Sequence, residues 1–205
     1  YPVSLLLSGR ECLIVGGGSV AYRKAADLVA CGAHVTVVSP EFCADIIRLE
    51  GVALVQRGFQ ESDAAGKTLV FAATSDAAVN RLAARAARCH GAWVNVVDTP
   101  AECDFFVPAA LHRGDLTISV STGGASPALA RRIREQLEAV FPDRYADFVS
   151  LVGDLRREVI AEVCDPEDRQ AILSRLAVES TWRLFESGGA DAVRRLARQL
   201  VADAR

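Results

Sequence analysis

Short apolar runs alternate with amphipathic stretches along the first half of the chain. The apolar runs are rich in β-branched residues and predict buried strands at 11–15, 33–38, 52–56, 67–74 and 93–98. The stretches between them show helical spacing, which predicts helices at about 18–31, 41–49 and 77–90. Strands that alternate with helices are typical of an α/β fold with a parallel sheet. Residues 1–8 either lie at the edge of that sheet or lead into its first strand.

The second half of the chain has a different pattern. Two extended pieces at 105–108 and 116–120 are joined by a segment in which Arg113-Gly114-Asp115 is typical of a hairpin turn. A helix is predicted from Pro127, and beyond residue 141 the apolar residues repeat every three or four positions. We therefore divide the chain into a doubly wound domain, a small α/β segment and an all-helical domain, at 1–108, 109–149 and 150–205.

The first predicted strand runs into three glycines, Gly16, Gly17 and Gly18. With Ala21 they form the G-x-G-x-x-A pattern of a dinucleotide-binding turn, in which Gly16 allows the bend and Gly18 the approach of a pyrophosphate. The helix start offers unpaired N–H groups to that phosphate. Strand, glycines, helix and second strand follow at βαβ spacing, so we predict a Rossmann-type doubly wound sheet. A tight β–α turn without a ligand is the alternative.

The second strand ends in Ser39, Pro40 and Glu41. Dinucleotide folds often place an acidic residue at this strand end to bind the adenosine ribose. Here Ser39 occupies the usual position, and the nearest carboxylate, Glu41, comes two residues later. No arginine follows at once to receive a 2′-phosphate, which favours NAD over NADP. Alternatively, Glu41 is a first-turn residue of the helix at 41–49, favoured by the helix dipole.

Two further strands end in polar residues. Thr74 follows the strand at 67–74, and Asp98 ends the strand at 93–98. The carboxyl ends of the strands line the ligand crevice in a doubly wound sheet, so Thr74 is a candidate cofactor contact and Asp98 a candidate catalytic acid. Capping of the following helix explains Thr74 equally well, and a turn starter before Pro100 is the alternative for Asp98.

A second glycine-rich loop covers residues 121–127 and leads into the helix that begins at Pro127. Ser126 as N-cap and Pro127 in the first turn make a clear helix start. Three arginines follow within two turns: Arg131, Arg132 and Arg134. Such a basic run is usually a solvated face. Beside a glycine loop and a helix N-terminus it also forms a place for carboxylates.

Composition narrows the function classes. The 205 residues carry a net charge of −3, so no global basic field indicates nucleic acid as a partner. Six cysteines lack zinc-site spacing and indicate a reducing compartment, and three scattered histidines predict no metal site. The sequence shows neither a signal peptide nor an apolar run of transmembrane length, so we expect a cytoplasmic protein without a membrane partner. Because Tyr1 stands in place of Met, we expect a few residues before it.

With these motifs in place, the chain resembles the N-terminal module of the siroheme synthase family, precorrin-2 dehydrogenase with or without sirohydrochlorin ferrochelatase. The resemblance is carried by the strings YPVSLLL at 1–7, CLIVGGGSVAYRK at 12–24, FAATSD at 71–76, NVVD at 95–98, FFVPA at 105–109 and STGGASPALARRIREQLE at 121–138. Residues 1–150 match strongly, and residues 150–205 match only by length and helicity.

The resemblance implies NAD-dependent oxidation of precorrin-2 to sirohydrochlorin, and in some members insertion of Fe²⁺ as a co-substrate. It also implies a homodimer that packs about residues 109–150 across its two-fold axis. Asp98 is then the acid of both reactions. The implied NAD contacts, with those from the patterns above, are Gly16, Gly17, Gly18, Ser19, Val20, Ser39, Pro40, Glu41 and Thr74.

The substrate is a polycarboxylate, which a chain of net charge −3 must bind through local groups. Our candidates for substrate binding are Asn95, Thr122, Gly123, Gly124, Ser126, Arg131, Arg132 and Arg134. Thr122 occupies the position of a phosphorylatable Ser in the multifunctional enzyme. Two other functions stay open: a Rossmann oxidoreductase of an unrelated small substrate, and a non-catalytic module that senses NAD.

Overall fold

The computed structural model describes residues 2–204 and divides the chain into two compact units, with the boundary between Val107 and Pro108. Tyr1 and Arg205, which belong to the predicted outer domains, lie outside the described residues. Each unit has its own hydrophobic core. Within the described part, no helix is long and apolar enough to cross a membrane. The two units are therefore described separately below.

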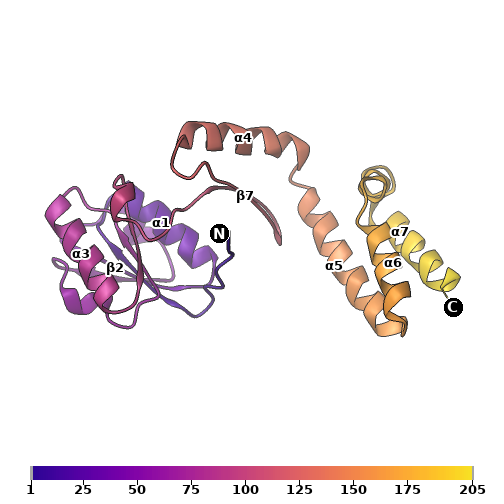
Figure 1. Ribbon diagram of the computed structural model, residues 1–205, viewed down its shortest axis with the longest axis horizontal. Helices are drawn as coiled ribbons and strands as arrows, with labels where there is room; N and C mark the ends of the chain where they lie inside the picture. Colours follow the sequence, from indigo (N-terminus) through magenta and orange to yellow (C-terminus); the bar gives the residue numbers. More distant parts are fainter. Residues whose placement is uncertain (1, 205) are drawn as a thin grey trace. The chain divides into compact units, whose positions relative to one another are not determined.

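The first unit is built on a five-stranded sheet, visible at the violet end of the ribbon in Figure 1. The strands are all parallel and lie in the order β3-β2-β1-β4-β5. Their bounds are β1 Glu11–Val15, β2 His34–Ser39, β3 Val52–Gln56, β4 Leu69–Ala72 and β5 Trp93–Val96. The strand order changes direction between β1 and β4. In open α/β sheets a ligand binds beyond the carboxyl ends of the strands at such a point.

Alternating side chains of the strands enter two separate cores, one on each face of the sheet. Cys12 and Ile14 of β1 pack with α1 (Ser19–Ala30), whereas Leu13 and Val15 pack with α3 (Ala77–Cys89). All four are essentially inaccessible to solvent. Complete burial of a Leu, Ile or Val side chain stabilises a fold by roughly 1.5–3 kcal/mol. Because the strands are buried on both faces of the sheet, their sequences are continuous apolar runs.

Three short helices complete the first unit: α2 Ala44–Arg48, the 3₁₀ turn η1 Glu61–Ala64 and the 3₁₀ turn η2 Pro100–Glu102. The helix predicted at 41–49 is therefore shorter than expected. Its N-cap is Cys43, and its first-turn acid is Asp45. Glu41 lies before this helix, so interpreting it as a first-turn residue is wrong.

The second unit begins with a two-stranded antiparallel sheet of β6 (Ala109–Arg113) and β7 (Leu116–Val120). The sequence placed the first arm of this hairpin at 105–108, and that placement is wrong. His112 and Arg113, assigned to the connection, pair with Thr117 and Leu116 in the ladder. The turn needs only Gly114, with φ of 58°, and the residue after it. Helix α4 (Pro127–Val140) follows.

Three helices end the chain: α5 Tyr145–Glu162, α6 Pro166–Leu176 and α7 Glu179–Asp203. Helix α7 is broken at Gly189, where φ is 66°. A core of mainly aliphatic and aromatic residues joins the three helices, with Trp182 stacked on Phe185. The predicted α/β fold class with a C-terminal helical part is confirmed, while the three-part domain division stays a prediction.

Candidate cofactor and substrate site

The glycine turn between β1 and α1 is packed tightly on two sides. Gly16 has φ of 125°, and a Cβ there would lie 2.5 Å from the carbonyl oxygen of Ala73. A Cβ on Gly17 would lie 1.9 Å from the carbonyl oxygen of Glu41. The Gly17 carbonyl also accepts a hydrogen bond from the Cys43 N–H at 2.8 Å. Both positions therefore require glycine, because the turn packs directly against the backbone of Ala73 and Glu41.

Gly18 differs from the two glycines before it. Its φ is −88°, and a Cβ placed on it would meet nothing within 4 Å. It is the N-cap of α1, whose first turn holds no acidic residue and receives no side-chain cap. The first N–H groups of a helix have no partner within the helix and carry partial positive charge. An open glycine before such groups fits the pyrophosphate of a dinucleotide, which would lie over Ser19 and Val20.

The end of β2 borders this turn. Ser39 is buried, and its hydroxyl lies beside Gly17. The Pro40 carbonyl accepts a hydrogen bond from the Gln56 amide at 3.3 Å. The side chain of Glu41 is exposed, so its carboxylate is available to a ribose hydroxyl, whereas its backbone carbonyl covers Gly17.

Thr74 is engaged in a local network beyond β4. Its hydroxyl donates to Asn80 Oδ1 at 2.7 Å and accepts from the Asp76 N–H at 3.1 Å. Asn80, which is buried, returns a bond to the Thr74 carbonyl, and Asp76 caps α3. The capping interpretation therefore accounts for the Thr74 hydroxyl, and a cofactor contact by Thr74 would use its backbone or methyl group.

Asp98 lies in a turn, because β5 ends at Val96 and not at residue 98 as predicted. Its φ of 59° is the single positive value among the described non-glycine residues. Its side chain is exposed. Such a conformation costs on the order of 1–3 kcal/mol in a residue with a Cβ, and residues held this way cluster at functional sites. The turn therefore presents a carboxylate at the carboxyl edge of the sheet, at an energetic cost.

The segment after Asp98 folds back along the free edge of β5, and we call residues 99–105 the edge clamp. Cys103 Sγ accepts from the Val96 N–H and donates to the Val96 carbonyl, both at 3.2 Å. The Asp104 carboxylate accepts from the Val94 N–H at 3.0 Å, and Arg88 donates to it at 2.9 Å. These bonds satisfy backbone groups that an edge strand leaves open.

Asn95 belongs to the same edge. Its side-chain amide donates to the Phe105 carbonyl at 2.9 Å, so its donor holds the end of the edge clamp. The sequence analysis did not find Cys103 or Asp104. The available signal was weak: a polar side chain shortly after a strand that ends the sheet.

The second glycine loop is organised by two hydroxyls. Ser126 Oγ accepts from the Leu129 N–H at 3.3 Å and caps α4, while Thr122 Oγ1 accepts from the Ser126 N–H at 3.0 Å. Gly123 and Gly124 adopt φ of 60° and 87°, and a Cβ on either would meet nothing within 4 Å. The loop is thus an open backbone surface at a helix N-terminus.

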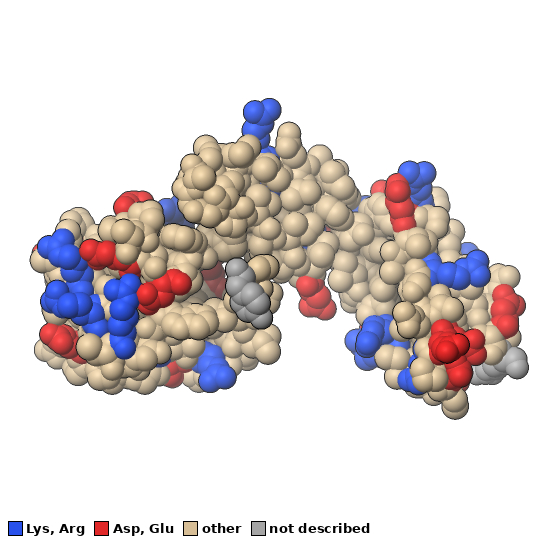
Figure 2. Space-filling view, in the orientation of Figure 1, with Lys and Arg blue, Asp and Glu red and all other residues tan. Residues whose placement is uncertain are grey.

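The three arginines of α4 are not equivalent. Arg131 and Arg132 are exposed and make no ion pair within the described chain. Arg134 is half-buried and pairs with Glu138 and, at 3.3 Å, with Glu135. Arg131 and Arg132 therefore offer free positive charge to an anion, whereas the charge of Arg134 is already compensated. Figure 2 shows Lys and Arg beside Asp and Glu in parts of the visible face, with wide uncharged areas elsewhere.

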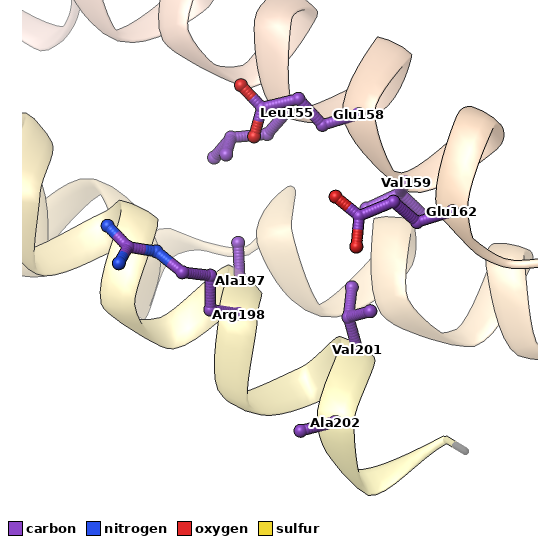
Figure 3. A pocket seen from close by; sticks show the side chains of 8 residues that line it. All are labelled: Leu155, Glu158, Val159, Glu162, Ala197, Arg198, Val201 and Ala202. Atoms are coloured by element: carbon purple, nitrogen blue, oxygen red, sulfur yellow. The ribbon is translucent and has the colours of Figure 1, made fainter.

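A small cleft lies between α5 and α7 in the helical part. Its volume is about 130 Å³, its floor is apolar, and Glu158, Glu162 and Arg198 stand at its rim (Figure 3). Ligand pockets for cofactors usually measure 300–1,000 Å³, so this cleft does not fit a dinucleotide or a macrocycle. Within residues 2–204, no cluster of three His, Cys, Asp or Glu side chains is arranged to hold a metal ion.

Two family models match the chain. One, described as putative NAD(P)-binding, matches residues 3–109, and one for the central part of sirohaem biosynthesis proteins matches residues 113–139. The siroheme synthase of Methylococcus capsulatus is 40% identical over 95% of this chain and 42% of its own length. That of Thioalkalivibrio sulfidiphilus is 39% identical over 95% of this chain and 40% of its own length. The chain therefore spans about two fifths of these curated relatives.

A solved structure is similar over the whole chain. SirC, a precorrin-2 dehydrogenase, superposes with a TM-score of 0.79 at 25% sequence identity and covers 98% of both chains. This similarity includes the parallel sheet, the small antiparallel sheet and the terminal helices. A nicotinamide cofactor is supported by the NAD(P)-binding model and by this dehydrogenase.

Proposed function

Because the chain belongs to the siroheme synthase N-terminal module family, we propose that it oxidises precorrin-2 to sirohydrochlorin with NAD. The open position at Gly18, before the uncapped start of α1, carries the proposal, because it leaves room for a pyrophosphate. A bound nicotinamide supplies the acceptor for the hydride. The residues of the chain must then bind both ligands and take up a proton.

The cofactor would be held by the first unit. The N–H groups of Ser19 and Val20 would bind the pyrophosphate, and the exposed Glu41 carboxylate would bind an adenosine ribose hydroxyl. Ser39 and Pro40 shape the backbone below that ribose. A negative group at this position disfavours a 2′-phosphate, which is why we propose NAD as the cofactor.

Asp98 is our candidate for the proton transfer. Oxidation of the macrocycle removes a hydride and a proton, and a positioned carboxylate can accept the proton. The turn holds Asp98 in a strained conformation with an exposed side chain, and the edge clamp fixes the chain that follows it. In Fe²⁺ insertion, with iron as a substrate, the same carboxylate would accept a pyrrole proton.

The carboxylates of the macrocycle would be bound by the second unit. Arg131 and Arg132 carry uncompensated charge, and the loop at Thr122, Gly123, Gly124 and Ser126 offers backbone N–H groups. Arg134 contributes less, because Glu135 and Glu138 neutralise it. Arginine binds carboxylates through paired, charge-assisted hydrogen bonds.

We propose that the chain forms a homodimer through the segment at 109–149. Helix α4 buries one residue, Ala130, and leaves Leu129 and Val140 49% and 62% exposed. Exposed apolar residues on one short element are typical of an interface. The six cysteines are free thiols, which supports the proposed cytoplasmic location.

Anaerobic incubation with precorrin-2 and NAD⁺ tests the activity. Formation of NADH together with sirohydrochlorin is expected, and Asp98→Asn should abolish both while NAD⁺ still binds. Subsequent addition of Fe²⁺ tests chelation, because sirohaem must form faster than in an enzyme-free control. NAD⁺ binding without any NADH would instead favour an unrelated substrate or a sensor function.

A further inference from the structure

The residue after β3, Arg57, follows the strand next to β2 at the carboxyl edge of the sheet, where the proposed ribose site lies. In the sheet register Gln56, the last residue of β3, pairs with Ser39, the last residue of β2. The Gln56 side chain extends this contact by donating to the Pro40 carbonyl. Arg57 therefore follows at the same carboxyl edge of the sheet, one strand away from Ser39-Pro40-Glu41. An arginine in this neighbourhood is what a 2′-phosphate requires.

The guanidinium of Arg57 is already occupied. It donates to both oxygens of the Asp63 carboxylate, at 2.8 and 2.6 Å, and to the Gly58 carbonyl at 3.0 Å. The Asp63 side chain is only 12% exposed, and the Gln60 N–H binds the same carboxylate at 2.9 Å. This bidentate pair compensates the charge of Arg57, and three of the five guanidinium N–H groups are engaged, so the side chain offers a phosphate no free charge.

We infer that the Arg57–Asp63 ion pair determines the choice between NAD and NADP. Arg57 follows the strand that pairs with β2 beside the proposed ribose site, and the pair with Asp63 keeps it from binding the 2′-phosphate of NADP. This inference rests on the proposed binding of a dinucleotide at the glycine turn. Two negative charges then act together: Asp63 neutralises Arg57, and the exposed Glu41 would disfavour a 2′-phosphate at the proposed ribose site. Release of Arg57 should shift preference toward NADP.

Asp63→Asn is the test variant, because asparagine keeps an oxygen for the Gln60 N–H and loses the charge that holds Arg57. The measurement is the ratio of the dissociation constants for NADP⁺ and NAD⁺, each determined by calorimetric titration of the full chain. A ratio cancels any uniform loss of affinity in a damaged variant. We expect the ratio to fall by about tenfold or more, the effect of one charge-assisted contact.

Three further variants make the result specific. The double variant Arg57→Gln/Asp63→Asn should return the ratio to the wild-type value. Asp154→Asn, which removes an equivalent charge from the Arg157 pair in the helical part, should leave the ratio unchanged. Asp63→Ser keeps a short acceptor for the same N–H and replaces Asp63→Asn if that variant does not fold.

The outcomes separate this inference from the proposed function. An unchanged ratio in a folded Asp63 variant would overturn the role of the ion pair and leave NAD binding intact. A fall in the ratio that persists in the double variant would overturn it as well, because Arg57 would not be responsible. A wild-type protein that binds neither dinucleotide would overturn the proposed function and this inference with it.

Discussion

The thiol of Cys103 lies 3.2 Å from both the amide nitrogen and the carbonyl oxygen of Val96. One side chain thereby satisfies a donor and an acceptor on the open edge of β5. Asp104 does the same for the Val94 N–H two residues earlier. Asp98 lies in the chain between β5 and these contacts. The edge next to the proposed catalytic carboxylate is therefore closed by side chains and backbone N–H groups of the following segment, and not by another strand.

Replacement of Cys103 tests this arrangement. Cys103→Ala should lower the free energy of unfolding by about 1–3 kcal/mol, because the Val96 N–H then loses its partner. Cys103→Ser should lose less, since a hydroxyl can still donate and accept, though over a shorter reach. Chemical unfolding measures the free energy of unfolding of each variant, and hydrogen exchange of the Val96 N–H shows whether that group keeps a hydrogen-bond partner. Equal stability of both variants and the wild type would show that the thiol contacts contribute nothing.

Substitutions at Asp98 should change the stability of the fold and the activity in different ways. Asp98→Gly should raise the free energy of unfolding by up to about 1 kcal/mol, because glycine adopts positive φ without steric cost. Asp98→Ala keeps a Cβ at φ of 59° and gains nothing. Both variants should lose the proposed oxidation of precorrin-2. Thermal unfolding and NADH formation, measured side by side, check the pair. An active Asp98→Gly enzyme would remove the residue from the mechanism.

The glycine turn offers a matched pair of substitutions. Gly18→Ala should bind NAD⁺ at least about tenfold more weakly and change the free energy of unfolding by less than about 1 kcal/mol, because a Cβ there meets only open space. Gly17→Ala should instead destabilise the fold, because its Cβ would overlap the Glu41 carbonyl. Titration and unfolding of both variants distinguish the two roles. Full NAD⁺ affinity in Gly18→Ala would place the pyrophosphate elsewhere.

Acid should weaken the first unit through Asp63. The hydrogen-bonded Arg57 guanidinium holds the pKa of that carboxyl below its ordinary value. The unfolded chain then binds the proton first, so the stability present above about pH 4 is lost as the pH falls through the lower, folded pKa. Urea unfolding over a pH series should show this loss. Asp63→Asn should be less stable at neutral pH and less sensitive to acid, and an unchanged acid slope would contradict the assignment.

The apolar face of α4 predicts the oligomeric state. Leu129→Glu or Val140→Glu should dissociate the proposed homodimer, because a charge would be buried without a partner. Light scattering during size-exclusion chromatography measures the mass of each variant. Ile47→Glu, an equally exposed apolar position in the first unit, serves as the control and should stay dimeric. A monomeric wild type would exclude this role for α4.

Local patterns were sufficient for much of this architecture. Alternating apolar runs, the three glycines and the Ser126-Pro127 helix start identified the strands, the cofactor turn and the start of α4. These features depend on neighbours a few residues away, so backbone preferences and periodicity express them directly. The motif at 121–138 likewise indicated the family from the local sequence.

Contacts between distant residues were decided only by the tertiary structure. Position 17 requires glycine because the Glu41 carbonyl lies against it. Arg57 is paired with Asp63, and the spacing of these two residues in the sequence does not predict that pair. The hairpin was misplaced because its register depends on cross-strand pairing, and β5 ended early because Asp98 turns the chain. Each of these outcomes depends on where two separate segments meet, which no local pattern records.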